Sequence, residues 1–416
     1  MKKLVCLILC VLLLHTSVWA ANPVPKFDIL SKNAVVMEAE TGQVLFDQGM
    51  NEQKYPASIT KVMTALIALE HCELTDVITV SDYAVEQTLG TSSIGLAAGD
   101  VLTVEDALHG MMLESANDCA IVIAEDVAGS EKDFVKLMNE KAKELGATNT
   151  NFVNSHGLHD EKHYTTAYDM ALITREAMKN PDFVKIAGAK TYTMSDNPDR
   201  VRSNKNLMLQ SGPYYYEYAR FGKNGFTTPA QNTMVVEAKR GTLELICVVM
   251  NCTDGEKKYE DAANLLDFCY ENFYKTKIDN DLIDPPAGKL WGTFGKIGRV
   301  DFQLDGEAFV MLPNGVGAEE LSFSYELAPR YKRAEEYTAS VTVSSDGAEL
   351  FQIPMTGTAK KTITFYNILK TIFWLIIAAI VFIIGVAVYY IIEAERKKKQ
   401  RRKAKFRRTF RVKKDL

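Results

Sequence analysis

Ser58 and Lys61 are the two residues whose types and spacing most directly suggest chemistry. They lie three positions apart in residues 55–70, where apolar residues recur at helical spacing after a proline. Positions i and i+3 share one face of a helix, so the lysine amine can reach the serine hydroxyl. If burial or a neighbouring cation lowers the pKa of this amine, it can accept the hydroxyl proton and make the serine a nucleophile.

The pattern also has a simpler interpretation, in which the serine caps a helix and the lysine is solvated. A Ser-x-x-Lys match arises roughly once or twice by chance in a chain of this length. The pair therefore needs companions, namely a second proton-transfer group, an amide that orients the substrate and a cation for a substrate carboxylate. Ser115-Ala116-Asn117 and Lys223-Asn224-Gly225 offer these groups.

Three other stretches match the same short patterns. Ser195-Asp196-Asn197 and Lys239-Arg240-Gly241 lie in polar stretches where turn formation is a sufficient explanation. Lys296-Ile297-Gly298 lies in a later, strand-rich region. We therefore favour the first pair of companions.

Hairpins and helices are expected to hold these residues. The alternation of residue types predicts hairpins over 34–46 and 233–251. Helical spacing predicts helices over 104–112, 118–127, 131–145, 166–178 and 262–274, with Thr103 capping the first and Gly146 ending the third. We expect an α+β domain in which both ends of the chain segment contribute to one sheet, with helices on its faces.

Both ends of the chain carry membrane-related signals. Lys2 and Lys3 precede an apolar run and a small-residue site near Ala21, which predicts a secretory signal peptide over residues 1–21. Residues 372–392 are apolar without a charge, and about 20 such residues suffice to span a bilayer as a helix. We assign 366–392 to a transmembrane helix.

Charge orients the chain across the membrane. Residues 396–416 contain thirteen Lys or Arg and one Asp, so they carry a net charge of +12. Basic segments beside a span remain in the cytoplasm, which predicts a cytoplasmic tail over 393–416 and an extracytoplasmic domain before the span. The whole chain has a net charge of -5, so the part outside the tail is strongly acidic and disfavours a nucleic-acid partner.

A proline-rich stretch marks a domain boundary. Asp284-Pro285-Pro286 separates a main domain over 22–280 from a small β domain over 281–360.

The cysteines show no sign of a metal site. An odd number of cysteines follows the signal peptide, at spacings that match no metal site. We expect mostly unpaired packing thiols, and one disulfide remains open.

Taken together, the three motifs resemble those of the serine-type D-alanyl-D-alanine carboxypeptidases, the low-molecular-mass penicillin-binding proteins of peptidase family S11. The motif residues are Ser58-Ile59-Thr60-Lys61, Ser115-Ala116-Asn117 and Lys223-Asn224-Gly225. The resemblance covers residues 27–275 closely and 285–360 loosely. It implies a DD-peptidase/β-lactamase-like fold, in which an antiparallel sheet flanked by helices carries a helical lobe, with an all-β second domain.

The resemblance also implies roles for these residues. Ser58 would attack the bond between the two terminal D-alanines of a peptidoglycan stem peptide, with Lys61 as base and Ser115 as proton relay. Asn117 would orient the substrate amide, and Lys223 would attract the terminal carboxylate. Gly225 would leave room for the substrate, and the backbone N–H groups of Ser58 and Phe226 would form an oxyanion hole.

The implied partners are peptidoglycan stem peptides, β-lactam antibiotics as acylating ligands, and a bacterial cell membrane. No cofactor and no metal are implied. His156, His159 and His163 are close in sequence, but a catalytic zinc site needs three well-placed ligands, and we consider the segment a loop near the cleft.

Asn224 departs from the family pattern, which has threonine between lysine and glycine. This change keeps open a catalytically weakened protein that binds penicillin or muropeptides. Two further alternatives are a D,D-endopeptidase that cleaves cross-links and, with less support, a β-lactamase.

Overall fold

The computed structural model describes residues 23–279, 281–292, 295–332, 336–345, 347–361 and 364–412. The expected signal peptide over 1–21 lies outside the described residues. The chain divides into two compact units. The first contains the residues up to 282 together with 307–323 and 343–351, and the second contains the remainder.

A five-stranded antiparallel sheet forms the centre of the first unit. Its order is β2-β1-β9-β8-β7. The strands are β1 (Asn33–Glu38), β2 (Val44–Gln48), β7 (Ala219–Thr227), β8 (Gln231–Arg240) and β9 (Leu243–Cys252). Both predicted hairpins are present, and β1 pairs with β9 so that Val35 lies opposite Val248. The sheet is therefore assembled from both ends of the segment, as expected.

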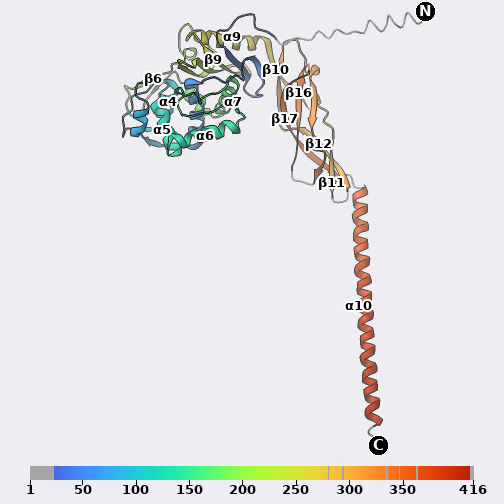
Figure 1. Ribbon diagram of the computed structural model, residues 1–416. Coiled ribbons are helices and arrows are strands. Elements are labelled where there is room, and N and C mark those ends of the chain that lie inside the picture. Colours follow the sequence, from blue (N-terminus) through green and yellow to red (C-terminus); the bar gives the residue numbers. More distant parts are fainter. Residues whose placement is uncertain are drawn as a thin grey trace, which may run out of the picture. The chain divides into compact units, whose positions relative to one another are not determined.

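Helices cover both faces of this sheet. Up to residue 282, the helices of the first unit among the described residues are η1 (Ala57–Thr60), α2 (Lys61–His71), α3 (Asp82–Gln87), α4 (Val104–Leu113), α5 (Asn117–Ala128), α6 (Glu131–Glu144), α7 (Ala167–Ala177), α8 (Pro181–Gly188), η2 (Leu207–Leu209) and α9 (Lys257–Asn272). One face packs on the core around α2, and α9 covers the other face. In Figure 1, α4, α5 and α6 lie together in a helical lobe.

Local sequence explains where several helices begin and end. Thr103 accepts a hydrogen bond from the Asp106 N–H, and the Asp106 side chain bonds back to Thr103, which is a capping box. The α6 helix is followed by Gly146 with φ of +79°, a conformation that favours glycine.

Two predicted elements differ from the structure. The last helix of the unit, α9, covers Lys257–Asn272 instead of 262–274, and Phe273 begins β10 (Phe273–Ile278). β10 pairs with β13 (Ala308–Pro313), a contact between distant residues that helical periodicity cannot reveal. Lys223-Asn224-Gly225 lies within β7 rather than on the approach to a hairpin, because glycines at 222 and 225 weaken the strand signal.

Short paired segments complete the first unit. β3 (Val77–Thr79) pairs with β4 (Val101–Thr103), and β5 (Thr191–Thr193) pairs with β6 (Val201–Ser203). The five cysteines that follow the expected signal peptide are all unpaired, which confirms the expectation of packing thiols. Four are buried, and Cys72 is half-buried.

The second unit is rich in strands. β11 (Gly288–Gly292) pairs with β12 (Gly295–Leu304), β12 pairs with β17 (Ala348–Lys361), and β15 (Tyr331–Lys332) runs parallel to β11. These strands belong to a sheet in the order β14-β16-β17-β12-β11-β15, with β14 at Ser322–Glu326 and β16 at Tyr337–Ser345. The short helix η3, at Ala318–Glu320, belongs to the first unit.

The long helix α10 (Thr364–Val412) belongs to the second unit. Within it, residues 368–404 include a window with a mean hydropathy of 3.0, which is apolar and long enough to cross a membrane. The described side chains of its apolar part are largely exposed, as expected for a helix that does not pack in a protein core.

Candidate active site

The Lys61 amine is the centre of the candidate site. Its Nζ atom lies 3.2 Å from the Ser58 hydroxyl oxygen, 2.6 Å from Asn117 Oδ1 and 2.6 Å from the His156 carbonyl oxygen. The last two atoms can only accept hydrogen bonds. A neutral amine has two N–H groups for these acceptors and one lone pair for the Ser58 proton. The three contacts therefore fit a base that is aimed at Ser58.

Burial favours that neutral amine. Lys61 is fully buried, and this burial lowers its pKa well below the usual value for lysine, with a further lowering from the positive charge of Lys223. Asn117 provides a neutral acceptor for the amine, and the negative charge of Asp118 opposes the lowering to a smaller extent. The local environment thus prepares Lys61 to accept a proton.

The backbone around Ser58 is fixed by close contacts with β7 and β8. Ala57 has φ of +50°, which is uncommon for a residue with a side chain. The Thr233 hydroxyl donates to the Pro56 carbonyl over 2.8 Å. A Cβ atom on Gly225 would lie 2.7 Å from the Ser58 nitrogen, so only glycine lets β7 approach the nucleophile this closely.

The second motif lies in the turn between α4 and α5. Ser115 has φ of +62°, and the Asn117 N–H donates to the Ser92 carbonyl over 2.7 Å. Asp118 accepts hydrogen bonds from the Ser93 hydroxyl and from the backbone of Ile94. The carboxylate therefore anchors the neighbouring loop and leaves Ser115 and Asn117 to face the cleft and Lys61.

Lys223 of the third motif contacts Ser115 of the second motif. Lys223 Nζ lies 3.0 Å from the Ser115 hydroxyl oxygen and 2.8 Å from the Asn224 carbonyl oxygen. Lys223 is buried, and this burial, together with the charges of Lys205 and Lys258, lowers its pKa to about 7. The three motifs thus form one connected group, as the sequence predicted.

A cleft of about 250 Å³ opens onto this group. Six of the predicted site residues line it: Ser58, Ser115, Lys223, Asn224, Gly225 and Phe226. Lys61 and Asn117, the other two, are buried next to Ser58.

Lys205 and Lys258 also line the cleft, although no motif in the sequence identified them. Lys258 is on α9, is buried, and donates to the Gly255 carbonyl over 2.8 Å. Lys205 pairs with Glu114 at 2.9 Å. Only the fold shows that these lysines share the cleft with Lys223, which makes it a suitable site for a carboxylate.

The Asn224 amide is already engaged. Its Nδ2 group donates to the Lys205 carbonyl over 2.9 Å and to the Tyr259 hydroxyl over 2.7 Å. Its Oδ1 atom is buried and unpaired in the part of the chain that the structure describes. The side chain of Asn224 therefore has no free N–H group for a ligand.

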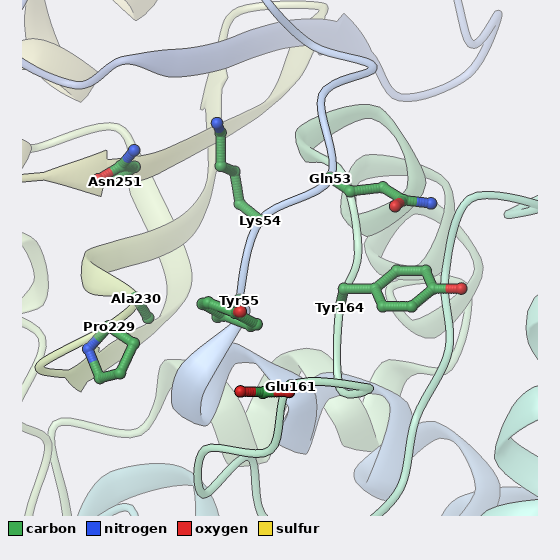
Figure 2. Close-up of a pocket in the computed structure, with 8 residues that line it drawn as sticks. All are labelled: Gln53, Lys54, Tyr55, Glu161, Tyr164, Pro229, Ala230 and Asn251. Atoms are coloured by element: carbon green, nitrogen blue, oxygen red, sulfur yellow. The ribbon is translucent and has the colours of Figure 1, made fainter.

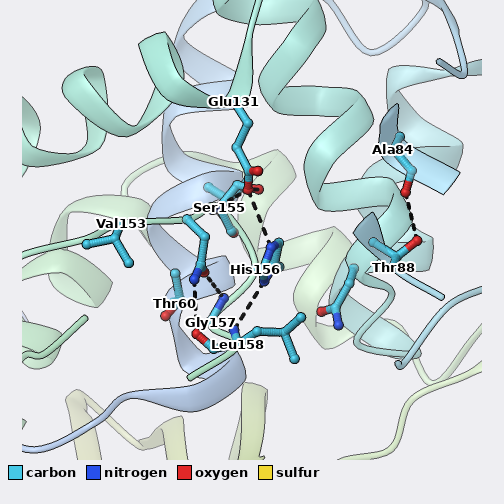
Figure 3. A network of polar contacts seen from close by, with 12 residues as sticks. Thr60, Ala84, Thr88, Glu131, Val153, Ser155, His156, Gly157 and Leu158 are labelled. Carbon is cyan, nitrogen blue, oxygen red and sulfur yellow. Dashed lines mark hydrogen bonds and ion pairs between the residues drawn. The ribbon is translucent and has the colours of Figure 1, made fainter. Parts of the chain in front are cut away.

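A buried network supports the carbonyl that holds Lys61. The Glu131 carboxylate accepts from the Ser155 N–H at 2.9 Å and from the Ser155 hydroxyl at 2.7 Å, and it lies 3.5 Å from His156 Nε2. Figure 3 shows Glu131 above Ser155 and His156. The Leu158 N–H donates to His156 Nδ1, which leaves the proton of a neutral ring on Nε2, facing Glu131. Sequence patterns gave no signal for Glu131.

His163 contacts η1, the short helix that contains Ser58. The Val153 N–H donates to His163 Nδ1 over 3.2 Å, and His163 Nε2 lies 2.9 Å from the Thr60 hydroxyl oxygen. Burial lowers the pKa of His156 to about 3 and that of His163 to about 4. His159 instead makes an edge-on contact with Tyr55. The three histidines therefore have separate structural surroundings.

The competing motifs have other partners. The Ser195 hydroxyl donates to Asp106 on α4. Lys239, on β8, pairs with Glu244 at 3.5 Å. Lys296 is exposed on β12 in the second unit.

Cys119 is another nucleophilic group near Lys61. Its side chain is buried, and its sulfur lies 2.8 Å from the position that a Cβ on Gly110 would take. Cys119 therefore acts in packing.

Comparisons with known proteins agree with this geometry. The model of the peptidase S11 family, D-alanyl-D-alanine carboxypeptidase, matches residues 18–254. D-alanyl-D-alanine carboxypeptidase DacF of Bacillus subtilis is 34% identical over 250 residues, which are 58% of this chain and 63% of that protein. The chain thus spans slightly less than two thirds of that relative.

Two further similarities extend beyond the catalytic region. D-alanyl-D-alanine carboxypeptidase DacC of Escherichia coli is 30% identical over 308 residues, 70% of this chain and 74% of that protein. The crystal structure of penicillin binding protein 5 from Haemophilus influenzae covers 82% of this chain and 99% of its own, with a TM-score of 0.68 and 24% identity. At that identity the second similarity supports the fold alone.

Proposed function

Because this chain belongs to the peptidase S11 family of D-alanyl-D-alanine carboxypeptidases, we propose that it removes the terminal D-alanine from peptidoglycan stem pentapeptides through an acyl-enzyme on Ser58. The observation that carries this proposal is the set of three contacts of the buried Lys61 amine with Ser58, Asn117 and His156. These contacts leave the lone pair of a neutral amine for the proton of the Ser58 hydroxyl.

In the acylation step, Ser58 Oγ forms a bond to the carbonyl carbon between the two D-alanines, and Lys61 accepts the hydroxyl proton. The carbonyl oxygen becomes an oxyanion, which the backbone N–H groups of Ser58 and Phe226 would stabilise. Each such donor contributes about 2.7–4 kcal/mol in a comparable hydrolase. The close approach of Gly225 to the Ser58 nitrogen supports this pairing of donors from η1 and β7.

The leaving amine must receive a proton when its bond to the carbonyl breaks. Ser115 is suited to deliver it, because its hydroxyl contacts Lys223 and faces the cleft. The proton that Lys61 accepted would pass to Ser115 in its place, so that Lys61 is neutral again before deacylation. Free D-alanine then departs, and water attacks the ester carbonyl of the acyl-enzyme. Lys61 takes a proton from that water, and Ser58 regains its own as the shortened peptide leaves.

Substrate position follows from charge and from the free edge of β7. The terminal carboxylate would lie near Lys223 and Lys258, whose positive charges favour it. The peptide would run antiparallel along β7, since an exposed strand edge offers backbone groups to an extended ligand. Asn117 would orient the amide of the substrate from the opposite wall.

The same site would be acylated by β-lactam antibiotics, which carry a reactive amide and a carboxylate. The membrane arrangement is a further part of the proposal: α10 would cross the bacterial cell membrane once, with the catalytic unit outside and the basic tail in the cytoplasm. This arrangement would keep the enzyme close to newly made cell wall.

A weakened enzyme that mainly binds its ligand is the second candidate. The occupied amide of Asn224 supports it, because this residue offers no free N–H to the substrate carboxylate. Product analysis separates the two candidates. Full-length protein in detergent is incubated with purified muropeptides, and mass spectrometry follows loss of one alanine from pentapeptides and of cross-links from dimers.

Wild-type protein is expected to produce tetrapeptides and free D-alanine. The Ser58→Ala and Lys61→Ala variants are expected to produce neither. Intact pentapeptides together with a stable penicillin adduct would favour the binding protein. Loss of cross-links without loss of terminal alanine would favour the endopeptidase.

A further inference from the structure

Basic side chains gather on one face of the sheet in the second unit. They come from the neighbouring strands β17, β12, β11 and β15 and from the residue before β15, together with one tryptophan. We call this set the basic face: Lys289, Trp291, Lys296, Arg299, Arg330, Lys332 and Lys360. Side chains alternate between the two faces of a strand, and the intervening residues Leu290, Val300 and Tyr331 are buried. The basic face is therefore the solvent side of this sheet.

The register of the strands places like charges directly opposite one another. Lys289 is the partner of Arg299, and Arg299 is the partner of Lys360. Like charges in this arrangement destabilise a sheet. Asp301 compensates in part, because it pairs with Arg299 and with Lys360, each at 2.9 Å. Among the described residues no carboxylate pairs with Lys289 or Lys296, so an excess of positive charge remains.

This excess contrasts with the rest of the chain. Outside the basic tail that follows the span, the chain is strongly acidic. A surface that serves solubility alone mixes charges of both signs. One sign of charge on one face instead attracts a partner of the opposite sign. The basic face thus has the charge of a surface that meets an anion.

The basic face lies at the end of the sheet from which the chain enters α10. The hairpin between β11 and β12 and the last residues of β17 share this end, because Lys361 at the end of β17 pairs with Gly298 near the start of β12. Helix α10 begins at Thr364, and the candidate span begins at Ile368. Three extended residues and one helical turn reach about 17 Å at most.

This distance brings the basic face close to a membrane surface. The headgroup layer of one leaflet is roughly 5–8 Å thick. Electrostatic attraction extends about one Debye length, roughly 8 Å, beyond it. The end of the sheet therefore lies within the range of charged headgroups.

The residue types also match a phospholipid surface. Tryptophan favours the membrane–water interface, and Trp291 is half-buried on this face. Arg330 lies over the Trp291 ring, 4.6 Å from its centre. The planar fork of an arginine suits the oxygens of a phosphate, whereas the neighbouring Lys296 and Lys332 act as point charges.

We propose that the basic face binds the anionic phosphate headgroups of the bilayer that α10 crosses, and so holds the second unit against the membrane surface. The inference rests on the membrane arrangement proposed above and is independent of the reaction at Ser58. It gives the second unit a partner of stated chemistry, an anionic phospholipid.

Lysine labelling of the full-length protein tests this contact. The protein is placed in nanodiscs of phosphatidylcholine alone, or of phosphatidylcholine and phosphatidylglycerol in equal parts. An acetylating reagent is added, and peptide mass spectrometry follows each lysine. Labelling of Lys289, Lys296 and Lys360 is expected to be about threefold slower in the anionic discs, and this difference should shrink at 1 M NaCl.

Two lysines are internal controls. Lys361 is exposed at the same end of the sheet but follows Lys360 directly, so it lies on the opposite face. Lys54 belongs to the first unit, and Figure 2 shows it beside a cavity with its amine pointing away from Glu161. Both are expected to label at the same rate in the two kinds of disc. Equal slowing at Lys360, Lys361 and Lys54 would reflect a general change in reactivity and would overturn the basic face.

A charge-reversed variant tests whether the face itself makes the contact. Lys289→Glu/Lys296→Glu is expected to bring the protection of Lys360 down to about one. The matched control is Lys132→Glu/Lys143→Glu, since both residues are exposed on α6 of the first unit, and it should keep the full protection.

The outcomes separate this inference from the other proposals. Equal labelling of the basic face in both discs, or protection that persists in Lys289→Glu/Lys296→Glu, would overturn it. Protection that appears only when soluble polyphosphate is added to neutral discs would also overturn it, in favour of a soluble polymer. Protein that enters neither disc would contradict the span and, with it, this inference. Release of D-alanine is measured separately in detergent, so its absence would bear on the reaction alone.

Discussion

The Lys223 amine and the Ser115 hydroxyl lie 3.0 Å apart although 108 residues separate them in the chain. Lys223 comes from the edge strand β7, and Ser115 comes from the turn between α4 and α5. The contact joins the sheet to the helical lobe across the cleft. A proton relay and a cation for the substrate carboxylate are therefore parts of one hydrogen-bonded group.

Replacement of Lys223 by alanine is expected to reduce kcat/KM for D-alanine release by about 10²–10³, the usual effect of removing one electrostatic contact to the reacting groups. The measurement is steady-state release of D-alanine. Lys239→Ala serves as the control, because Lys239 also precedes Arg-Gly in a Lys-x-Gly pattern but pairs with Glu244 on the neighbouring strand. An equal loss of kcat/KM in both variants would show that Lys223 has no specific role in the active site.

The Asn224→Thr variant is expected to raise kcat/KM for a peptide with a terminal carboxylate about five- to tenfold. Threonine would offer a hydroxyl to the carboxylate, whereas both N–H groups of Asn224 are engaged by Lys205 and Tyr259. The matched substrate is the same peptide with a C-terminal amide, for which we expect little change. A gain on both substrates, or a loss on the first, would contradict this interpretation of Asn224.

Gly157→Ala is expected to slow acylation by a penicillin at least about tenfold. A Cβ atom at this position would lie 2.0 Å from the Ala57 carbonyl oxygen, next to the nucleophile. Gly146→Ala is a matched control, since Gly146 also has a left-handed backbone but no atom within 4 Å of the added Cβ. It should cost about 1–2 kcal/mol of stability and leave acylation intact. Equal acylation rates in the two variants would show that the close contact between Gly157 and the Ala57 carbonyl does not position the nucleophile.

The first unit is expected to lose stability as the pH falls below about 6.5. His163 has a folded-state pKa of about 4, whereas an unfolded histidine titrates near 6.5. The unfolded state therefore binds more protons in this range, and protonation favours unfolding. The shift corresponds to about 3 kcal/mol from His163, lost progressively between these two pH values. His156, with a pKa of about 3, acts in the same direction.

Urea unfolding followed by near-ultraviolet circular dichroism between pH 4 and 7.5 measures this dependence. His163→Gln is expected to flatten the fall in the unfolding midpoint, and His71→Gln is expected to leave it unchanged because His71 is exposed. A midpoint that stays constant from pH 6.5 to 4 in wild-type protein would show that His163 remains charged in the fold.

Local patterns predicted the parts of the site that lie within a few residues of each other. The Ser58–Lys61 spacing follows from helix geometry, and the Thr103 cap follows from its own short sequence. The meeting of the three motifs was expected from the family resemblance. The pairing of β1 with β9 followed from the two hairpin signals and the helical block between them.

Features that depend on distant contacts could not be predicted in this way. Lys258 enters the cleft because α9 begins earlier than its apolar periodicity indicates. Glu131 reaches Ser155 because α6 packs beside the loop that follows it, and an acidic residue at a helix start normally suggests only a favourable first turn. Phe273 was assigned to a helix because its strand partner, Pro313, is forty residues away.

The most direct test of the account is to locate the covalent adduct of a penicillin on the full-length protein by peptide mass spectrometry. We predict a single adduct on Ser58, slow to form in Lys61→Ala and unaffected in Lys239→Ala. An adduct on Ser115 or Ser195, or one that forms on Ser58 at the wild-type rate without Lys61, would contradict the assignment of Ser58 as nucleophile and Lys61 as its base.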